Sequence, residues 1–261
     1  MISDLDLIID AAREAGALAR TLRDQGLTTE IKADSSPVSN ADLATDGLLK
    51  ARLRQARPDY GWLSEETADN ADRLAATRLF VVDPIDGTRS FVAGRPWWSV
   101  SIAIIEAGQP TQGVVYAPDT DEVFAAVAGK GATRNGEPLV ASTCDQIEGC
   151  GMVGDPRMFA HPSWPTPWPP MRIESRNSTA YRMCLVASGA FDATLALVAK
   201  SDWDIAAGDL IAREAGAWSG THQGRAFQFN QTEPAQTSLV CAAPNLVPLI
   251  LNRVSAIALR S

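Results

Sequence analysis

Apolar residues recur every three or four positions along the first part of the chain. Over residues 3–25 this spacing predicts an amphipathic helix with one face toward a core. Ser3 is a suitable N-cap for that helix, and Gly26 is a suitable stop. A second helix is predicted to follow residues 38–42 and to run to about Ala56. The chain therefore begins with two helices that each offer an apolar face.

The pattern changes to that of strands after the second helix. A continuous apolar run at residues 79–82 predicts a buried strand, and the alternating segment 98–105 predicts another. Residues 113–118 and 122–127 are predicted to form a hairpin around a polar turn. The segment 129–138 is a further turn with Asn-Gly at its tip. These strands predict an antiparallel sheet, flanked by the first two helices, up to about residue 140.

The later part of the chain mixes helices and strands. Residues 155–170 are rich in proline and tryptophan and lack periodicity, which predicts a surface loop. A helix is predicted at 181–187, a strand at 191–197, and an alanine-rich helix from about residue 203. A strand at 239–243 and a terminal helix complete the expected elements.

Composition and charge narrow the class of protein. The chain has 261 residues, of which 46% are hydrophobic and 21% charged, as in ordinary globular enzymes. Its net charge of −8 argues against a nucleic-acid-binding surface. No apolar run approaches the roughly 20 residues of a membrane span, and the acidic N-terminus is unlike a secretion signal. We therefore expect a cytoplasmic enzyme with neither a membrane nor a nucleic acid as partner.

Histidines and cysteines are too few for several kinds of chemistry. The chain has two histidines and four cysteines, and the cysteines lack the spacing of metal ligands. A zinc site, a Cys/His nucleophile pair and a disulfide scaffold are each disfavoured. Acid–base chemistry would then fall to carboxylates, hydroxyls and metal-activated water.

Two aspartates leave the end of the predicted strand at 79–82 together. Asp83 and Asp86 are three residues apart, with Pro84 between them and an Asp-Gly-Thr turn or helix start after them. No cationic side chain lies in this stretch before Arg89. Two adjacent buried carboxylates repel each other unless a cation neutralises them, and hard oxygen ligands suit magnesium, calcium or manganese. A solvated Asp-Gly turn is the alternative.

The whole string at residues 83–91 resembles the signature of the inositol monophosphatase superfamily, which is Asp-Pro-(Ile/Leu)-Asp-Gly-Thr followed by small or polar residues and an aromatic one. A second resemblance lies at residues 203–217, which match the superfamily pattern of Trp-Asp, small residues, an apolar pair and Ala-Gly. The Glu65-Glu66 pair and the segment 38–42 occur in the order that the superfamily shows. Together these elements cover most of the chain.

The resemblance implies a ligand set for two or three Mg²⁺ ions. The implied metal ligands are Glu65, Asp83, the carbonyl of Ile85, Asp86 and Asp204. Glu66 is implied as a supporting catalytic residue beside the first ligand. From the residues alone, a glutamate pair is usually a solvated surface feature, and a helix cap is the alternative role for Asp204.

The resemblance also implies which residues meet water and substrate. Thr88, backed by Asp42, would orient the attacking water, although Asp42 alone is also a plausible helix cap. The implied substrate contacts are Gly87, Thr88, Ser178, Thr179, Ala180 and Asp204, the first two through N–H groups at a helix start. Lys32 occupies the place of a lysine that approaches the metal site in the superfamily, but a solvated lysine is the preferred interpretation.

The implied architecture is an α+β fold, a layered αβαβα sandwich with the site between two units. Residues 1–140 would carry most metal ligands, and residues 141–261 would carry Asp204 and substrate contacts. The implied reaction is magnesium-dependent hydrolysis of a small phosphorylated substrate such as inositol 1-phosphate, by attack of a metal-activated water. Inhibition by lithium is expected by analogy, and a homodimer is one expected assembly.

The substrate remains open among three classes. Inositol-specific enzymes often carry a glutamate where this chain has Leu197, and a histidine where it has Ser201. An apolar residue there is more like a 3′(2′),5′-bisphosphate nucleotidase, whereas Asp-Pro-Ile-Asp is more like a monophosphatase. Arg89 is similar to the residue found in histidinol-phosphate phosphatases. A non-catalytic regulatory scaffold is a further alternative, which the complete set of carboxylates disfavours.

Overall fold

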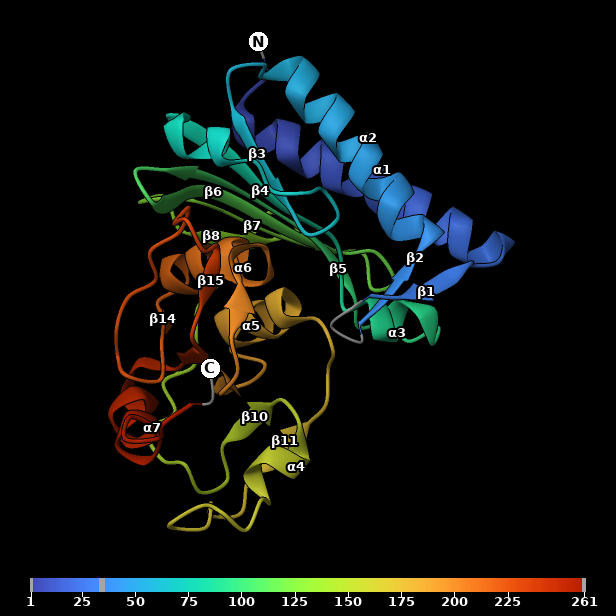
Figure 1. Cartoon of the computed structure of the whole chain (residues 1–261). Coiled ribbons are helices and arrows are strands. Elements are labelled where there is room, and N and C mark those ends of the chain that lie inside the picture. The colour runs from blue at the N-terminus through green and yellow to red at the C-terminus, as the bar shows by residue number, and fades with distance from the viewer. Residues whose placement is uncertain (1, 33–35, 260–261) are drawn as a thin grey trace.

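The computed structural model of the chain describes residues 2–32 and 36–259 and arranges them in five layers (Figure 1). Helices α1 (Asp4–Gln25) and α2 (Asn40–Ala56) cover one face of a large sheet, and α5 (Thr179–Ala187) and α6 (Asp202–Glu214) cover the other. A smaller sheet packs on these two inner helices, and α7 (Val247–Val254) packs on its far side. The predicted α+β layered αβαβα sandwich is therefore confirmed.

The large sheet has seven strands in the order β3-β4-β5-β6-β7-β8-β9. Its members are β3 (Gly61–Ser64), β4 (Arg78–Asp86), β5 (Ser99–Glu106), β6 (Gln109–Ala117), β7 (Glu122–Val127), β8 (Ala132–Arg134) and β9 (Glu137–Pro138). All neighbouring pairs are antiparallel except β3 and β4. The antiparallel pairing predicted for the strands now seen as β4 to β7 is confirmed. The parallel pair involves β3, which was not predicted, and residues 65–77 cross over there instead of making a tight turn.

The smaller sheet has five strands in the order β11-β10-β12-β16-β14. They are β10 (Gly151–Val153), β11 (Arg172–Glu174), β12 (Ala193–Ala196), β14 (Trp218–Gly220) and β16 (Leu239–Ala242). Here β10 pairs in parallel with β11 and β12, and β16 pairs antiparallel with its two neighbours.

Short elements connect the layers. Two small ribbons pair β1 (Thr29–Ile31) with β2 (Pro37–Ser39) and β13 (Lys200–Ser201) with β15 (Ala235–Gln236). The remaining short helices are η1 (Ala71–Ala75), α3 (Thr88–Val92), α4 (Pro156–Phe159) and η2 (Pro244–Leu246). The sequence also predicts a polar loop at residues 33–37, and most of this segment lies outside the described residues.

Both faces of β4 are buried, which explains its continuous apolar run. Phe80 and Val82 belong to the core under α1 and α2, whereas Leu79 and Val81 belong to the core around α5 and α6. Side chains alternate between the faces of a strand, so the next odd-numbered residue, Asp83, faces α6. The strand thus delivers a carboxylate into the layer between the two sheets.

Small residues let α6 approach its neighbours closely. A Cβ atom added to Gly113 on β6 would lie 3.1 Å from the Cα of Ala207. A Cβ atom on Gly208 would lie 2.9 Å from the sulfur of Met183 on α5. Larger residues here would push the helix away from the sheet. Among the described residues, no helix is long and apolar enough to cross a membrane.

Candidate active site

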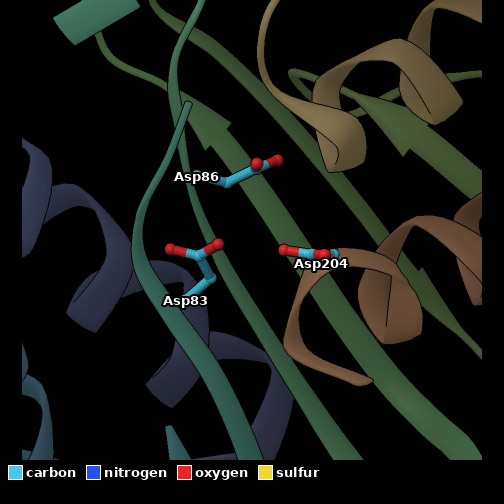
Figure 2. Close-up of side chains that lie close together, drawn as sticks. All are labelled: Asp83, Asp86 and Asp204. Atoms are coloured by element: carbon cyan, nitrogen blue, oxygen red, sulfur yellow. The ribbon is translucent and has the colours of Figure 1, made fainter. Parts of the chain in front are cut away.

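Three aspartates from distant parts of the sequence meet between the large sheet and α6 (Figure 2). Asp83 and Asp86 project from the end of β4, and Asp204 projects from the first turn of α6 toward them. One carboxylate oxygen of each lies within 4.8 Å of the others. Asp83 and Asp86 are buried, with 1% and 5% of their surface exposed, whereas Asp204 is partly exposed. The structure thus brings together three of the predicted metal ligands.

An irregularity at the end of β4 brings the second aspartate onto the same side. Strict alternation would place Asp83 and Asp86 on opposite faces of the strand. The pairing of β4 with β5 shifts register between these two residues, as at a β-bulge, and the N–H of Ile85 donates to Oδ1 of Asp83 at 3.0 Å. Gly87 follows with φ of 93°, so the chain turns at once into α3.

The N-terminus of α5 holds the carboxylate of Asp86. Its Oδ1 accepts the N–H of Thr179 at 3.1 Å, and its Oδ2 accepts the N–H of Ala180 at 2.7 Å and the hydroxyl of Ser178. Free N–H groups at a helix start favour an anion. The structure therefore gives residues 178–180 a contact with Asp86, and their assignment as substrate contacts stays a prediction.

A capping box fixes Asp204 at the start of α6. The carboxylate of Asp204 accepts the N–H of Ser201 at 3.1 Å, as the N3 residue of such a box does. Lys200 places its Nζ 3.8 Å from Oδ2 of Asp204. The two predicted roles of this residue, helix cap and member of the acidic cluster, are thus compatible.

The glutamate pair lies beside this cluster and is held by a lysine. Nζ of Lys32 lies 2.9 Å from Oε1 of Glu65 and 2.7 Å from Oε1 of Glu66. The preferred interpretation of Lys32 as a solvated residue is therefore wrong, because the β1–β2 ribbon carries it to both glutamates. Glu65 does not belong to the compact group of three aspartates, but its charge acts on Asp83. Its role as a metal ligand stays a prediction.

Asp42 and Thr88 meet as the resemblance implies. Oγ1 of Thr88 lies 3.1 Å from Oδ1 of Asp42 and 3.1 Å from the carbonyl oxygen of Ile85. The other oxygen of Asp42 accepts the N–H of Ser39 at 2.8 Å and its hydroxyl at 2.6 Å. Asp42 therefore caps α2 and contacts the threonine at the same time. Its role in catalysis stays a prediction.

Burial and mutual repulsion disfavour the ionised carboxylates of the cluster. Burial, followed by the charges of Glu65 and Asp86, raises the pKa of Asp83 well above its ordinary value. Burial raises the pKa of Asp86 to about 6 against the hydrogen bonds from residues 178–180. Burial also raises the pKa of Glu66 to about 7, although the hydrogen bond from Lys32 opposes this. The raised pKa values show that the negative charges of these carboxylates are incompletely neutralised. A divalent cation that prefers oxygen ligands fits such a site.

Sequence reasoning missed two residues that surround the site. One is Arg182 on α5. Burial lowers the pKa of its guanidinium, and the charges of Asp86 and Asp204 are near enough to oppose this effect. No sequence motif indicated this residue. Asp46, one helical turn after Asp42, accepts the hydroxyls of Ser64 and Thr67 at 2.5 and 2.6 Å and so fixes both ends of the glutamate turn. The spacing of four residues between the two aspartates of α2 was the available signal for Asp46.

The buried acidic cluster between the two sheets of the layered α+β sandwich is a candidate metal site. Comparison with known proteins gives the family of the chain. The model of the inositol monophosphatase family matches residues 3–258. The chain is 35% identical to the protein named Nus factor SuhB of Pasteurella multocida, over 96% of this chain and 95% of that protein. It is 34% identical to an inositol-1-monophosphatase of Mesorhizobium japonicum, over 84% and 86% of the two chains.

A solved structure agrees with these similarities. The inositol monophosphatase of Thermotoga maritima superposes with a TM-score of 0.84 at 27% identity, and the match covers 97% of each chain. The chain belongs to the inositol monophosphatase family, and the comparisons support a phosphatase. The resemblance that the two sequence signatures indicated is confirmed.

Proposed function

We propose that the protein is a magnesium-dependent phosphomonoesterase whose substrate is a small phosphate monoester such as inositol 1-phosphate. The observation that carries this proposal is the convergence of Asp83, Asp86 and Asp204 beside the Thr88–Asp42 pair. A buried carboxylate cluster supplies oxygen ligands of the kind that magnesium prefers, and a hydroxyl paired with a carboxylate can orient water.

The metal ligands in this proposal are Glu65, Asp83, Asp86, Asp204 and the carbonyl of Ile85, for two or three Mg²⁺ ions. When bound, such ions neutralise phosphate charge and lower the pKa of water. The Thr88 hydroxyl donates its hydrogen bond to Asp42, which fixes the Thr88 rotamer, and its oxygen accepts a hydrogen bond from the attacking water. As the water attacks, its proton passes to Thr88 while the Thr88 hydroxyl proton passes to Asp42. Glu66 lies next to Glu65 and shares Lys32 with it, which limits the movement of both carboxylates.

The phosphate would bind at the start of α3. The N–H groups of Gly87 and Thr88 lie at the N-terminal end of this short helix, directly after Asp86. Gly87 adopts a left-handed conformation here, and the N of Ser178 and the carbonyl oxygen of Trp97 would both contact a Cβ atom at this position. This turn keeps the two N–H groups next to the aspartates that would hold the metal.

The first test is phosphate release in the presence of Mg²⁺ from inositol 1-phosphate, adenosine 3′,5′-bisphosphate and histidinol phosphate. We expect release from at least one of them, loss of release with a chelator, and loss in the Asp86→Asn variant. The substrate that gives the highest kcat/KM decides between monophosphatase, bisphosphate nucleotidase and histidinol-phosphate phosphatase. No release from any of the three would contradict the proposed function.

A regulatory role is the second candidate, and the printed name of one relative, a Nus factor, is what favours it. The complete set of carboxylates in this chain favours catalysis, because a scaffold needs no such cluster. A pull-down that captures a stoichiometric partner, together with no Mg²⁺-dependent turnover, would reverse this order.

A further inference from the structure

Arg182 carries a guanidinium with few hydrogen-bond partners next to the acidic cluster. It lies on α5, one turn after Ser178, which contacts Asp86. Its Nη2 donates to Oγ1 of Thr179 at 3.2 Å. Its Nε is buried and has no hydrogen-bond partner among the described residues, and no contact of Nη1 within hydrogen-bond distance is found there. A guanidinium has five N–H donors, and buried donors are nearly always paired.

The acidic cluster does not explain this arginine as a direct partner. The charges of Asp86 and Asp204 act on Arg182, yet within the described residues neither carboxylate lies within the 4.0 Å of an ion pair with it. Asp86 already accepts three hydrogen bonds from residues 178–180, and Asp204 has Ser201 and Lys200. Arg182 is therefore a positive charge near the cluster with spare donors.

The end of the guanidinium that carries Nη1 lies against a glycine instead of a side chain that could accept its hydrogen bonds. A Cβ atom added to Gly154, which follows β10, would lie 3.9 Å from Nη1 of Arg182. A side chain longer than alanine at this position would extend across the guanidinium. The arrangement offers a planar pair of donors, with no protein carboxylate to match them among the described residues, on the helix whose start lies against Gly87.

We propose that Arg182 binds a second anionic group of the substrate, and that the enzyme prefers phosphate monoesters that also carry a phosphate or carboxylate. This inference rests on the proposed phosphatase function and names the class of substrate for it. A second anion fits better than a hydroxyl because a guanidinium binds carboxylate and phosphate through two parallel hydrogen bonds. The guanidinium also supplies positive charge, which offsets the repulsion between a second anion and the nearby carboxylates.

Matched pairs of phosphate monoesters test this preference. Glycerol 2-phosphate and 2-phosphoglycerate differ by a hydroxymethyl group against a carboxylate. Inositol 1-phosphate and inositol 1,4-bisphosphate, and adenosine 3′-phosphate and adenosine 3′,5′-bisphosphate, differ by one phosphate over longer spans. We expect the wild-type enzyme to prefer the doubly anionic member of at least one pair by about tenfold or more in kcat/KM. A charge-assisted hydrogen bond contributes a preference of this size.

The Arg182→Gln variant should lose this preference. The ratio of kcat/KM within the preferred pair should fall at least about tenfold, mainly through KM, and Arg182→Lys should restore part of it. Lys200→Gln is the matched control, because it removes an equal charge beside Asp204. We expect it to lower kcat/KM for both members of the pair alike and to leave their ratio unchanged.

Binding without turnover gives a second readout. In a Thr88→Ala background, calorimetry should show tighter binding of the doubly anionic member, and the added Arg182→Gln change should remove the difference. Melting temperatures of all variants check that each is folded. Equal kcat/KM within every pair for the wild type, or a ratio unchanged in Arg182→Gln, would overturn the inference. No phosphate release from any of these six compounds or from histidinol phosphate would instead overturn the proposed function itself.

Discussion

At the scale of single residues, Gly87 connects β4, which carries Asp83 and Asp86, to the proposed phosphate site. Its φ of 93° lies in the region that favours glycine, and a Cβ atom there would lie 3.0 Å from the N of Ser178 and 3.0 Å from the carbonyl of Trp97. Two independent constraints thus act on this residue, one from the conformation of the chain and one from the space around it.

Gly87→Ala should therefore destabilise the protein more than a glycine replacement that meets only conformational strain. We expect a loss of about 1–3 kcal/mol in the free energy of unfolding, together with loss of phosphatase activity. Gly94→Ala is the matched control, since Gly94 has φ of 65° but nothing within 4 Å of its added Cβ atom. Urea unfolding of both variants measures the difference, and equal losses would contradict the steric part of the argument.

Thr88 offers a second prediction at this scale. Thr88→Ala removes the hydroxyl that contacts Asp42 and should lower kcat about 10²- to 10⁴-fold, the usual contribution of positioned proton transfer. Thr88→Ser keeps the hydroxyl and should retain most of the rate. Steady-state kinetics with the preferred substrate separates the two variants. Similar activity of Thr88→Ala and the wild type would exclude the proposed role of this hydroxyl.

At the scale of elements, α2 serves two segments of the site from one face. Asp42 contacts Thr88 on α3, and Asp46, one turn later, contacts Ser64 and Thr67 around the glutamate pair. Asp42 and Asp46 are buried, with 1% and 6% exposed. The position of this helix therefore affects both the Thr88–Asp42 pair and the turn that carries Glu65 and Glu66.

Asp46→Ala should weaken the site without removing any proposed ligand. The hydroxyls of Ser64 and Thr67 would lose their acceptor, at a cost of about 1–3 kcal/mol in stability. We also expect a higher Mg²⁺ concentration for half-maximal activity, because Glu65 and Glu66 lie between these two residues. Asp209→Ala, which removes a buried aspartate partner of Ser219 far along α6, is the control for stability alone. If both variants raise the Mg²⁺ concentration for half-maximal activity equally, the result would argue against a role of Asp46 in positioning Glu65 and Glu66.

Local sequence patterns predicted some elements well and others poorly. The helix after Ser3 was predictable because its cap, period and glycine stop all act within a few residues. The parallel pairing of β3 with β4 was not, since it depends on a crossover and on which strand lies next in space. Lys32 was assigned to solvent for the same reason, because its partners lie more than thirty residues away.

At the scale of the whole molecule, pH and magnesium should act on stability together. Burial gives Asp86 a pKa of about 6 in the folded chain, against an ordinary 3.8, so the folded metal-free protein holds this proton more tightly than the unfolded chain. Its stability should fall as pH rises from 3.8 through about 6, by on the order of 3 kcal/mol from Asp86 alone. Asp83 and Glu66, whose pKa values are also raised, act in the same direction.

We therefore expect the chelator-treated protein to melt at a higher temperature near about pH 5 than near about pH 8, because Asp86 and Glu66 lose their protons in the folded chain between these two values. Excess Mg²⁺ should raise the melting temperature most at the higher pH, where the carboxylates are ionised and the ion competes with few protons. Differential scanning fluorimetry across this range measures both effects. A chelator-treated protein that is more stable at the higher pH would contradict the argument.

The candidate site was predictable from sequence to the extent that its residues form long signatures. Asp83, Asp86 and Asp204 were predicted from their motifs, and the structure places them together. The contacts of Arg182 and Asp46 follow from how helices pack on the sheet, which no local pattern records. Functional motifs therefore indicated the proposed chemistry, whereas Arg182, proposed to set selectivity, and Asp46, which supports the glutamate turn, were found only in the tertiary structure.

The acidic cluster joins β4 to a helix that the chain reaches only after five further strands have been added to the large sheet. Closing such a long loop is entropically costly, so the cluster should form late in folding. A ligand that binds only the closed cluster stabilises the native state and not the folding transition state. In stopped-flow experiments Mg²⁺ should then leave the refolding rate nearly unchanged and slow unfolding. The cation would therefore increase the kinetic stability of the native state.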